Sequence, residues 1–193
     1  MVKDLLSWLL WPLARMTRTV SVKLMALWSF ARLRASLSTP LHVSNVVLSP
    51  VAVEGTANIR IGRNARIYPG VLLETQGPGC IVIGDNVVLS RGVHIVAFDV
   101  VTLGDNCMVG EYASLRDADH KKNQYAMRDS GHDCAPIQLG RNVWIGRGAC
   151  VLKGVHIGDN SIVGANAVVT RDVATSSCAV GVPARARTLS FIA

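Results

Sequence analysis

The sequence predicts an all-β domain built as a three-sided stack of short strands, about six coils high, behind a helical N-terminal segment. Three observations support this fold class. An aliphatic residue returns every six positions through most of residues 41–187, which leaves residues 188–193 as a short tail. Seventeen glycines supply many tight turns. Aromatic residues make up only 5% of a chain that is 50% hydrophobic, so aliphatic side chains must fill the core.

The repeat is regular enough to count the coils. A period of six matches neither an α-helix nor simple strand alternation, but it fits a triangular coil with one short strand and one turn on each side. At the strand spacing of about 4.8 Å, six coils would stand roughly 29 Å tall. The residues predicted to point inward are Leu41, Val47, Val53, Ile61, Ile67, Leu73, Ile83, Leu89, Ile95, Leu103, Val109, Leu115, Leu139, Ile145, Val151, Ile157, Val163 and Val169.

One interruption breaks this rhythm. Leu103 and Leu139 begin successive coils but are 36 positions apart, where three repeats of six would give 18. The stretch LRDADHKKNQ, which starts at Leu115, leads into the interruption, and we place the inserted loop at residues 121–138. His120 stands directly before this loop. A polar insertion in an aliphatic scaffold is where we expect function.

The first 40 residues form a separate unit with the character of an amphipathic helical segment. They carry six Lys or Arg against one Asp, a net +5, whereas the other 153 residues carry +2, so the main domain is not expected to bind nucleic acid. Their apolar stretches, one of them broken by Pro12, fall short of the about 20 residues that span a membrane. Trp8, Trp11 and Trp28 beside basic residues suit a helix at a membrane surface. The alternative is packing on the main domain or on a partner subunit.

The five cysteines are widely scattered and show no CxxC or Cys/His metal spacing. This usage indicates reduced thiols in a cytoplasmic protein. Together with the basic N-terminal segment, it predicts a cytoplasmic location, peripheral at the inner face of the cytoplasmic membrane.

The repeats resemble a known family. The run IGRGACVLKGVHIGDNSIVGANAVVTRDV, which starts at Ile145, resembles the hexapeptide-repeat acyltransferases, whose fold is a left-handed parallel β-helix. Three features resemble the sugar and exopolysaccharide O-acetyltransferase branch: the 24 positions from His120 to Trp144, the run PIQLGRNVWIG from Pro136, and the ending AVGVPARAR. The resemblance implies a homotrimer with active sites between subunits, acetyl-CoA as co-substrate and a sugar or glycan acceptor.

Acyl transfer to a hydroxyl needs a base near neutral pH, and a neutral imidazole fits that task. The resemblance implies that His120 is this base and that the acceptor oxygen attacks the thioester directly. A carboxylate would hold the other ring nitrogen. We favour Asp117 over Asp119, because strand alternation would aim Asp119 away from His120. His132 is either a substrate contact or a solvated residue, and we expect a structural role for His156.

The resemblance also implies a groove for acetyl-CoA near the C-terminal coils. Cations there would suit its phosphates, and Trp144 would flank the pantetheine arm or the subunit boundary. Two departures from the branch stand out: Lys153 replaces a usual Pro, and Arg147 is large where small residues are common. The cofactor-binding residues implied by the resemblance are Trp144, Gly146, Arg147, Gly164, Ala165, Thr170, Arg171 and Arg185.

These observations predict an acetyl-CoA-dependent O-acetyltransferase that acts on a hydroxyl of a sugar or polysaccharide precursor. The alternatives are an N-acetyltransferase acting on an amino sugar and a non-catalytic β-helix scaffold protein. Metal chemistry is not expected, because the H-x4-H spacing of the similar γ-class carbonic anhydrases is missing.

Overall fold

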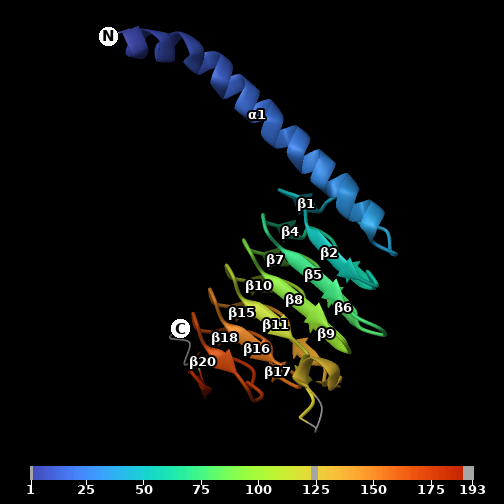
Figure 1. The fold of residues 1–193 in the computed structure, drawn as a ribbon. Helices are drawn as coiled ribbons and strands as arrows, with labels where there is room; N and C mark the ends of the chain where they lie inside the picture. Colours follow the sequence, from blue (N-terminus) through green and yellow to red (C-terminus); the bar gives the residue numbers. More distant parts are fainter. Residues whose placement is uncertain (1, 123–125, 189–193) are drawn as a thin grey trace.

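A computed structural model describes residues 2–122 and 126–188. One long helix, α1 (Val2–Ser36), leads into a three-sided parallel β-helix of about six coils (Figure 1). The predicted fold class is therefore confirmed. Of the predicted C-terminal tail, only Thr188 lies within the described residues, and it belongs to the last strand.

Each side of the triangle is one sheet, and the chain visits the three sides in turn. The first side contains β1 (Val46–Val47), β4 (Arg66–Ile67), β7 (Val88–Leu89), β10 (Met108–Val109), β15 (Trp144–Ile145), β18 (Ile162–Val163) and β20 (Ser177–Gly181), closed by the antiparallel β21 (Ala184–Thr188). The second contains β2 (Ala52–Gly55), β5 (Leu72–Thr75), β8 (His94–Ala97), β11 (Ser114–Arg116), β16 (Cys150–Leu152) and β19 (Val168–Val169). The third contains β3 (Ile59–Ile61), β6 (Cys80–Ile83), β9 (Val100–Leu103), β14 (Ile137–Leu139) and β17 (His156–Ile157).

The aliphatic positions of the six-residue repeat form the core as predicted. All eighteen are buried except Val53, which is half-buried in the first coil. A second inward row, two residues before many of these positions, was not predicted. It includes Ile59, Val87, Val101 and Val143, each of which is at most 1% exposed. Each side of the triangle therefore contributes two inward side chains to most coils.

Asparagines hold the corners between the third and first sides. Asn86 and Asn106 have φ values of 58° and 60°, a left-handed conformation that asparagine tolerates better than most residues. Their side chains also stack: Asn86 Nδ2 donates to Asn106 Oδ1 at 3.1 Å. The same residue type recurs at the same corner of successive coils because each coil makes the same turn.

The interruption of the rhythm is a hairpin that projects from the corner between the second and third sides. It consists of β12 (Ala118–His120), the 3-10 turn η1 (Met127–Asp129) and β13 (His132–Cys134). The chain leaves the coil at Asp117 and returns at Ile137, so the excursion starts and ends earlier than the predicted loop of residues 121–138. Residues 123–125 of that loop lie outside the described residues.

Helix α1 runs without a break through Pro12, which interrupts only the apolar run of the sequence. Its last turns pack on the first coil, where Leu33 is buried and Phe30 contacts the core. The rest extends away from the coils and bends near its N-terminal end (Figure 1). Within the described part of the chain, no helix combines the length and the apolar character that crossing a bilayer requires.

Candidate active site

The two strands of the projecting hairpin mirror each other in sequence. Ala-Asp-His on β12 pairs antiparallel with His-Asp-Cys on β13. Asp119 lies opposite Asp133, and His120 lies opposite His132. Successive side chains of a strand point to opposite faces. The two histidines therefore share one face of the hairpin, and the two aspartates share the other.

The histidine face packs on the preceding coil through a row of rings. The ring centroid of His132 lies 4.2 Å from that of Phe98 and 4.5 Å from that of His120. The guanidinium of Arg116 lies 5.7 Å from the Phe98 ring centroid. His132 is half-buried and His120 is exposed. His120 is thus supported by a second ring while remaining open to solvent.

The surroundings of His132 favour the uncharged form of its ring. Partial burial is the main cause that lowers the pKa of His132, followed by the nearby charges of His120 and Arg116. An imidazole with a lowered pKa is neutral at pH 7. His132 therefore offers His120 a neutral ring surface.

The aspartate face is held by a lysine from the next coil. Lys153 Nζ donates to Asp133 Oδ2 and lies 3.8 Å from Asp119 Oδ2. The hydrogen bond between Lys153 and Asp133 raises the pKa of the lysine and lowers that of the aspartate. Beside this face lies an open hollow of about 580 Å³, lined by Asp119, His120, Lys121, Lys122, Asp133 and Lys153.

Asp117 is placed differently from the expectation that it holds the imidazole of His120. It is fully buried, its Oδ1 accepts the N–H of Phe98 at 2.7 Å, and its Oδ2 accepts the N–H of Asp99 at 2.8 Å. Burial raises the pKa of Asp117 despite these two hydrogen bonds. Both oxygens are therefore used by the turn that carries Phe98. Asp117 reaches His120 indirectly, through the rings of Phe98 and His132.

Four of the predicted cofactor-binding residues meet at the corner between the first and second sides. The N–H of Gly146 donates to the Val163 carbonyl at 2.7 Å, which stacks Gly146 and Arg147 on Gly164 and Ala165. A Cβ atom on Gly146 would lie 2.6 Å from the Ala165 nitrogen, so the close stacking requires glycine. Within one chain, this corner lies at the opposite end of the second side from the hairpin.

The other predicted cofactor-binding residues lie elsewhere. Thr170 and Arg171 follow β19 at the same corner as the hairpin, two coils further on, and Arg171 shares a small hollow of about 110 Å³ with Arg185 of β21. Trp144, 48% exposed, lies on the first side in a groove of about 490 Å³ with Met108 and Ile162. The structure thus brings Arg171 and Arg185 together but separates them from Trp144.

Phe98, Lys153 and the paired aspartates are site residues that the sequence argument did not assign. The mirrored order DH…HD around the insertion could have revealed the hairpin, whereas Phe98 belongs to another coil and gave no local signal. His156, on β17, is exposed and does not line the hollow. Across residues 2–122 and 126–188, no three His, Cys, Asp or Glu side chains are grouped as metal binding requires.

Comparison with known proteins identifies the repeat. A family described as "Bacterial transferase hexapeptide (six repeats)" matches residues 136–171. The chain is 35% identical over 125 residues to the galactoside O-acetyltransferase of Escherichia coli (strain K12), a match that covers 65% of this chain and 61% of that protein. It is 29% identical to a putative lipopolysaccharide biosynthesis O-acetyl transferase of the same strain, over 72% of this chain and 76% of that protein. The chain therefore spans less than two thirds of the galactoside enzyme.

Solved structures share the fold. A mutant perosamine N-acetyltransferase from Caulobacter crescentus, in complex with CoA and GDP-perosamine, is 25% identical with a TM-score of 0.55, over 78% of this chain and 59% of that one. An N-acyltransferase from Bacillus cereus, in complex with dTDP and 3-hydroxybutyryl-CoA, has a TM-score of 0.68 at 17% identity, over 77% and 81% of the two chains. At 17% identity the likeness concerns the fold alone.

Proposed function

We propose that this chain, whose repeats match a hexapeptide-repeat transferase family, transfers an acetyl group from acetyl-CoA to a hydroxyl of a sugar or polysaccharide precursor. The observation that carries the proposal is the placement of His120. His120 is exposed and lines a hollow of about 580 Å³, and its ring packs against the ring of His132. The relatives named as O-acetyltransferases support the choice of acceptor.

In this mechanism His120 accepts the proton of the acceptor hydroxyl, and the freed oxygen attacks the carbonyl carbon of the thioester. When the carbon–sulfur bond breaks, His120 returns its proton to the departing thiolate. The products are the acetyl ester and CoA as a free thiol, and the imidazole is neutral again. Backbone N–H groups of a neighbouring coil would stabilise the oxyanion that forms between these steps.

The acetyl-CoA groove of this proposal is shared between subunits of a homotrimer. Gly146, Arg147, Gly164 and Ala165 lie at a different corner from His120 in one chain, so a neighbouring copy would have to supply the second wall. Arg171 and Arg185, both exposed, are suited to phosphate groups. A cytoplasmic position, peripheral at the inner face of the cytoplasmic membrane, belongs to the same proposal.

The second candidate is N-acetyl transfer to an amino sugar. The perosamine N-acetyltransferase favours it, since it shares the fold at 25% identity. The two acceptors place different demands on the base. A hydroxyl must lose its proton to His120, whereas an uncharged amine is already nucleophilic.

A thiol-release assay with acetyl-CoA and matched panels of hydroxyl and amino sugars tests both candidates. We expect turnover with at least one hydroxyl sugar and a loss of about 10²- to 10⁴-fold in kcat for His120→Ala. His42→Ala is the matched control, because His42 contacts Ser44 in the first coil. Turnover with amino sugars alone would select the second candidate. Full activity of His120→Ala would exclude His120 as the base, and no turnover with any acceptor would favour the scaffold alternative.

A further inference from the structure

Among the described residues, only the last turns of helix α1 pack on the core. Of its 35 residues, those that pack on the core lie at the C-terminal end, from Ser29 onward. At 1.5 Å per residue the helix is about 52 Å long, and most of that length projects from the coils (Figure 1). Large apolar side chains on this projecting part stay exposed, including Trp8 at 77% and Trp28 at 61%.

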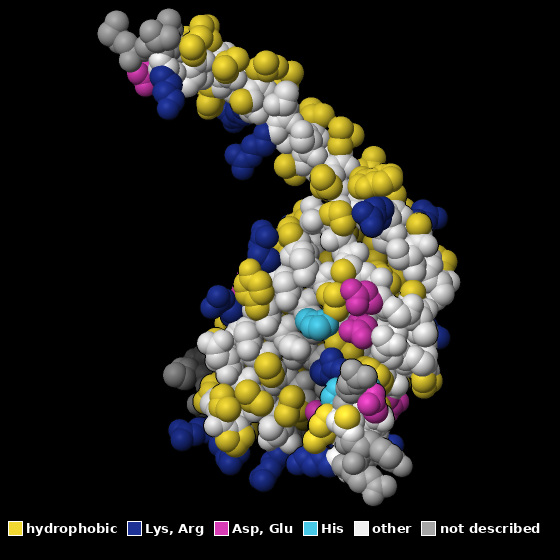
Figure 2. All heavy atoms as spheres, viewed as in Figure 1, with side chains coloured by type: hydrophobic (Ala, Val, Ile, Leu, Met, Phe, Trp, Pro, Cys, Tyr) yellow, Lys and Arg dark blue, Asp and Glu magenta, His cyan; other side chains and the backbone are white. Residues whose placement is uncertain are grey.

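Seven of these side chains form one continuous stripe. They are spaced three or four residues apart, which aligns them on one face of a helix. The hydrophobic side chains follow the edge of α1 that faces away from the coils (Figure 2). The stripe consists of Leu6, Leu9, Leu13, Met16, Val20, Leu24 and Leu27, which are 51–66% exposed.

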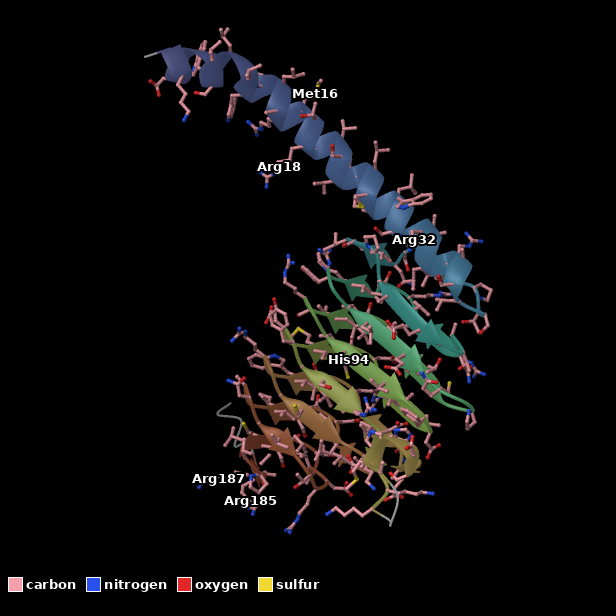
Figure 3. All side chains as sticks on the ribbon, viewed as in Figure 1. Met16, Arg18, Arg32, His94, Arg185 and Arg187 are labelled. Atoms are coloured by element: carbon pink, nitrogen blue, oxygen red, sulfur yellow. The ribbon has the colours of Figure 1, made fainter. Side chains whose placement is uncertain are left out.

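Two of the basic residues, Arg15 and Arg18, lie on the other side of the helix, whereas Lys23 borders the stripe between Val20 and Leu27. Met16 and Arg18 point to opposite sides of α1 (Figure 3). Arg15 lies next to Arg18 on the polar side, with its guanidinium 5.3 Å from the ring centroid of Trp11. Asp4 is the one acidic residue in the 35 residues of the helix, against six Lys or Arg. The helix therefore pairs an apolar stripe with a cationic edge.

We infer that α1 lies in the plane of an anionic lipid bilayer, with the stripe of seven residues turned toward the acyl chains. A helix that lies in the interface in this way contacts the acyl chains with one face only. An α-helix is about 10–12 Å thick with its side chains, so the opposite edge, with Arg15 and Arg18, reaches the level of the phosphate groups.

The charge distribution argues for lipid over a second copy of the chain. Coiled coils are stabilised by acidic and basic residues that face each other between the helices. Each copy of α1 carries six cations and only one carboxylate. Two copies side by side would therefore repel each other. An anionic surface, in contrast, attracts each of these cations by about 1 kcal/mol. Bound in this way, the coils stack away from the bilayer and the hairpin remains in water (Figure 1).

This inference deepens the peripheral location proposed above, and its test does not depend on catalysis. The full-length protein is floated with vesicles of phosphatidylcholine alone or of equal parts phosphatidylcholine and phosphatidylglycerol. We expect flotation with the mixed vesicles, weaker flotation with phosphatidylcholine alone, and release as salt rises from about 0.1 to about 1 M, where the Debye length falls from about 10 to about 3 Å.

Two double variants with the same added charge separate the stripe from the overall charge. Leu13→Glu with Val20→Glu places two carboxylates in the stripe and should reduce partitioning by more than about 100-fold. Ser7→Glu with Ser21→Glu adds the same charge outside the stripe and should reduce partitioning about 30-fold, through electrostatics alone. Circular dichroism melting shows whether each variant keeps its coils.

Equal flotation of the two double variants would overturn the inference, as would wild-type protein that ignores both kinds of vesicle. An oligomer of the wild-type protein that dissociates in the stripe variant without lipid would show that a second copy covers the stripe instead. Thiol release with a soluble acceptor should be the same in the stripe variant and the wild type. A failure of the transferase proposal would therefore appear in that assay and not in flotation.

Discussion

His120 and His132 face each other across the hairpin, with their ring centroids 4.5 Å apart. His132 in turn stacks on Phe98, whose backbone is held by the buried carboxylate of Asp117. The exposed imidazole is therefore the last in a series of contacts that begins at the buried Asp117. Two members of this series, His132 and Asp117, each predict a measurable effect.

His132 should position His120 by stacking and not by charge. His132→Ala removes the supporting ring and should lower kcat by about 10- to 100-fold with little change in KM, because small displacements of a catalytic group cost that much. His132→Phe keeps a ring between Phe98 and His120 and should retain most of the activity. Steady-state kinetics and the NMR line widths of the His120 ring report the two effects. Equal activity of the Ala variant and the wild type would show that His132 does not position His120.

Asp117 should act on stability first and on catalysis only through Phe98 and His132. Asp117→Asn replaces one acceptor with an NH2 group that faces a backbone N–H, so the free energy of unfolding should fall by about 1–3 kcal/mol. Asp105→Asn is the matched control, because Asp105 also accepts a backbone N–H, that of Asp85, but in an exposed turn. Urea denaturation measures both losses. A larger loss in the Asp105 variant would contradict the importance of burial.

The raised pKa of Asp117 also predicts the pH dependence of stability. The folded state holds the Asp117 proton to higher pH than the unfolded state, whose pKa is near the ordinary 3.8. The contribution of this group to stability should therefore fall as pH rises from the unfolded pKa to the folded pKa, and level off above it. Asp117→Asn should lose this slope in denaturation curves recorded between about pH 3 and about pH 7. The same slope in both proteins would assign the pH dependence to another group.

Lys153 should hold the hairpin against the next coil. Lys153→Met removes the contacts with Asp119 and Asp133 but keeps the length of the side chain. The pKa of Asp133, which Lys153 lowers, should return toward 3.8, and the hairpin should be cleaved faster by protease. In the wild type, the stabilising effect is present above the unfolded pKa of Asp133 and is lost as pH falls through the lower folded pKa.

Lys122→Met provides the control for Lys153, because Lys122 lines the same hollow. It should leave the pKa of Asp133, measured by carboxyl NMR titration, unchanged. If both lysine variants shift that pKa equally, the specific bond between Lys153 and Asp133 is not its cause.

The sequence alone was sufficient to predict the coils, their number and the inward aliphatic row. These features are local: each unit of six residues carries its own core side chain and its own turn residue, so the period can be read without knowing which coils touch. The spacing to Trp144 and the position before the loop also select His120 from the sequence, and its role as the base stays a prediction.

The contacts that give His120 its surroundings were decided by the tertiary structure. Asp117 binds the turn of the preceding coil instead of its neighbour His120, because burial leaves a carboxylate dependent on any N–H groups within reach. Lys153 and Phe98 reach the hairpin from coils about 20 positions away along the chain. Which residues become such partners depends on how the hairpin aligns with the neighbouring coils. The six-residue repeat gives the alignment of the coils, but the inserted hairpin has no repeat, so its alignment cannot be derived from the sequence. Helix α1 shows the same limit, since the sequence left open whether this segment packs on the main domain, and the structure places its last turns on the first coil.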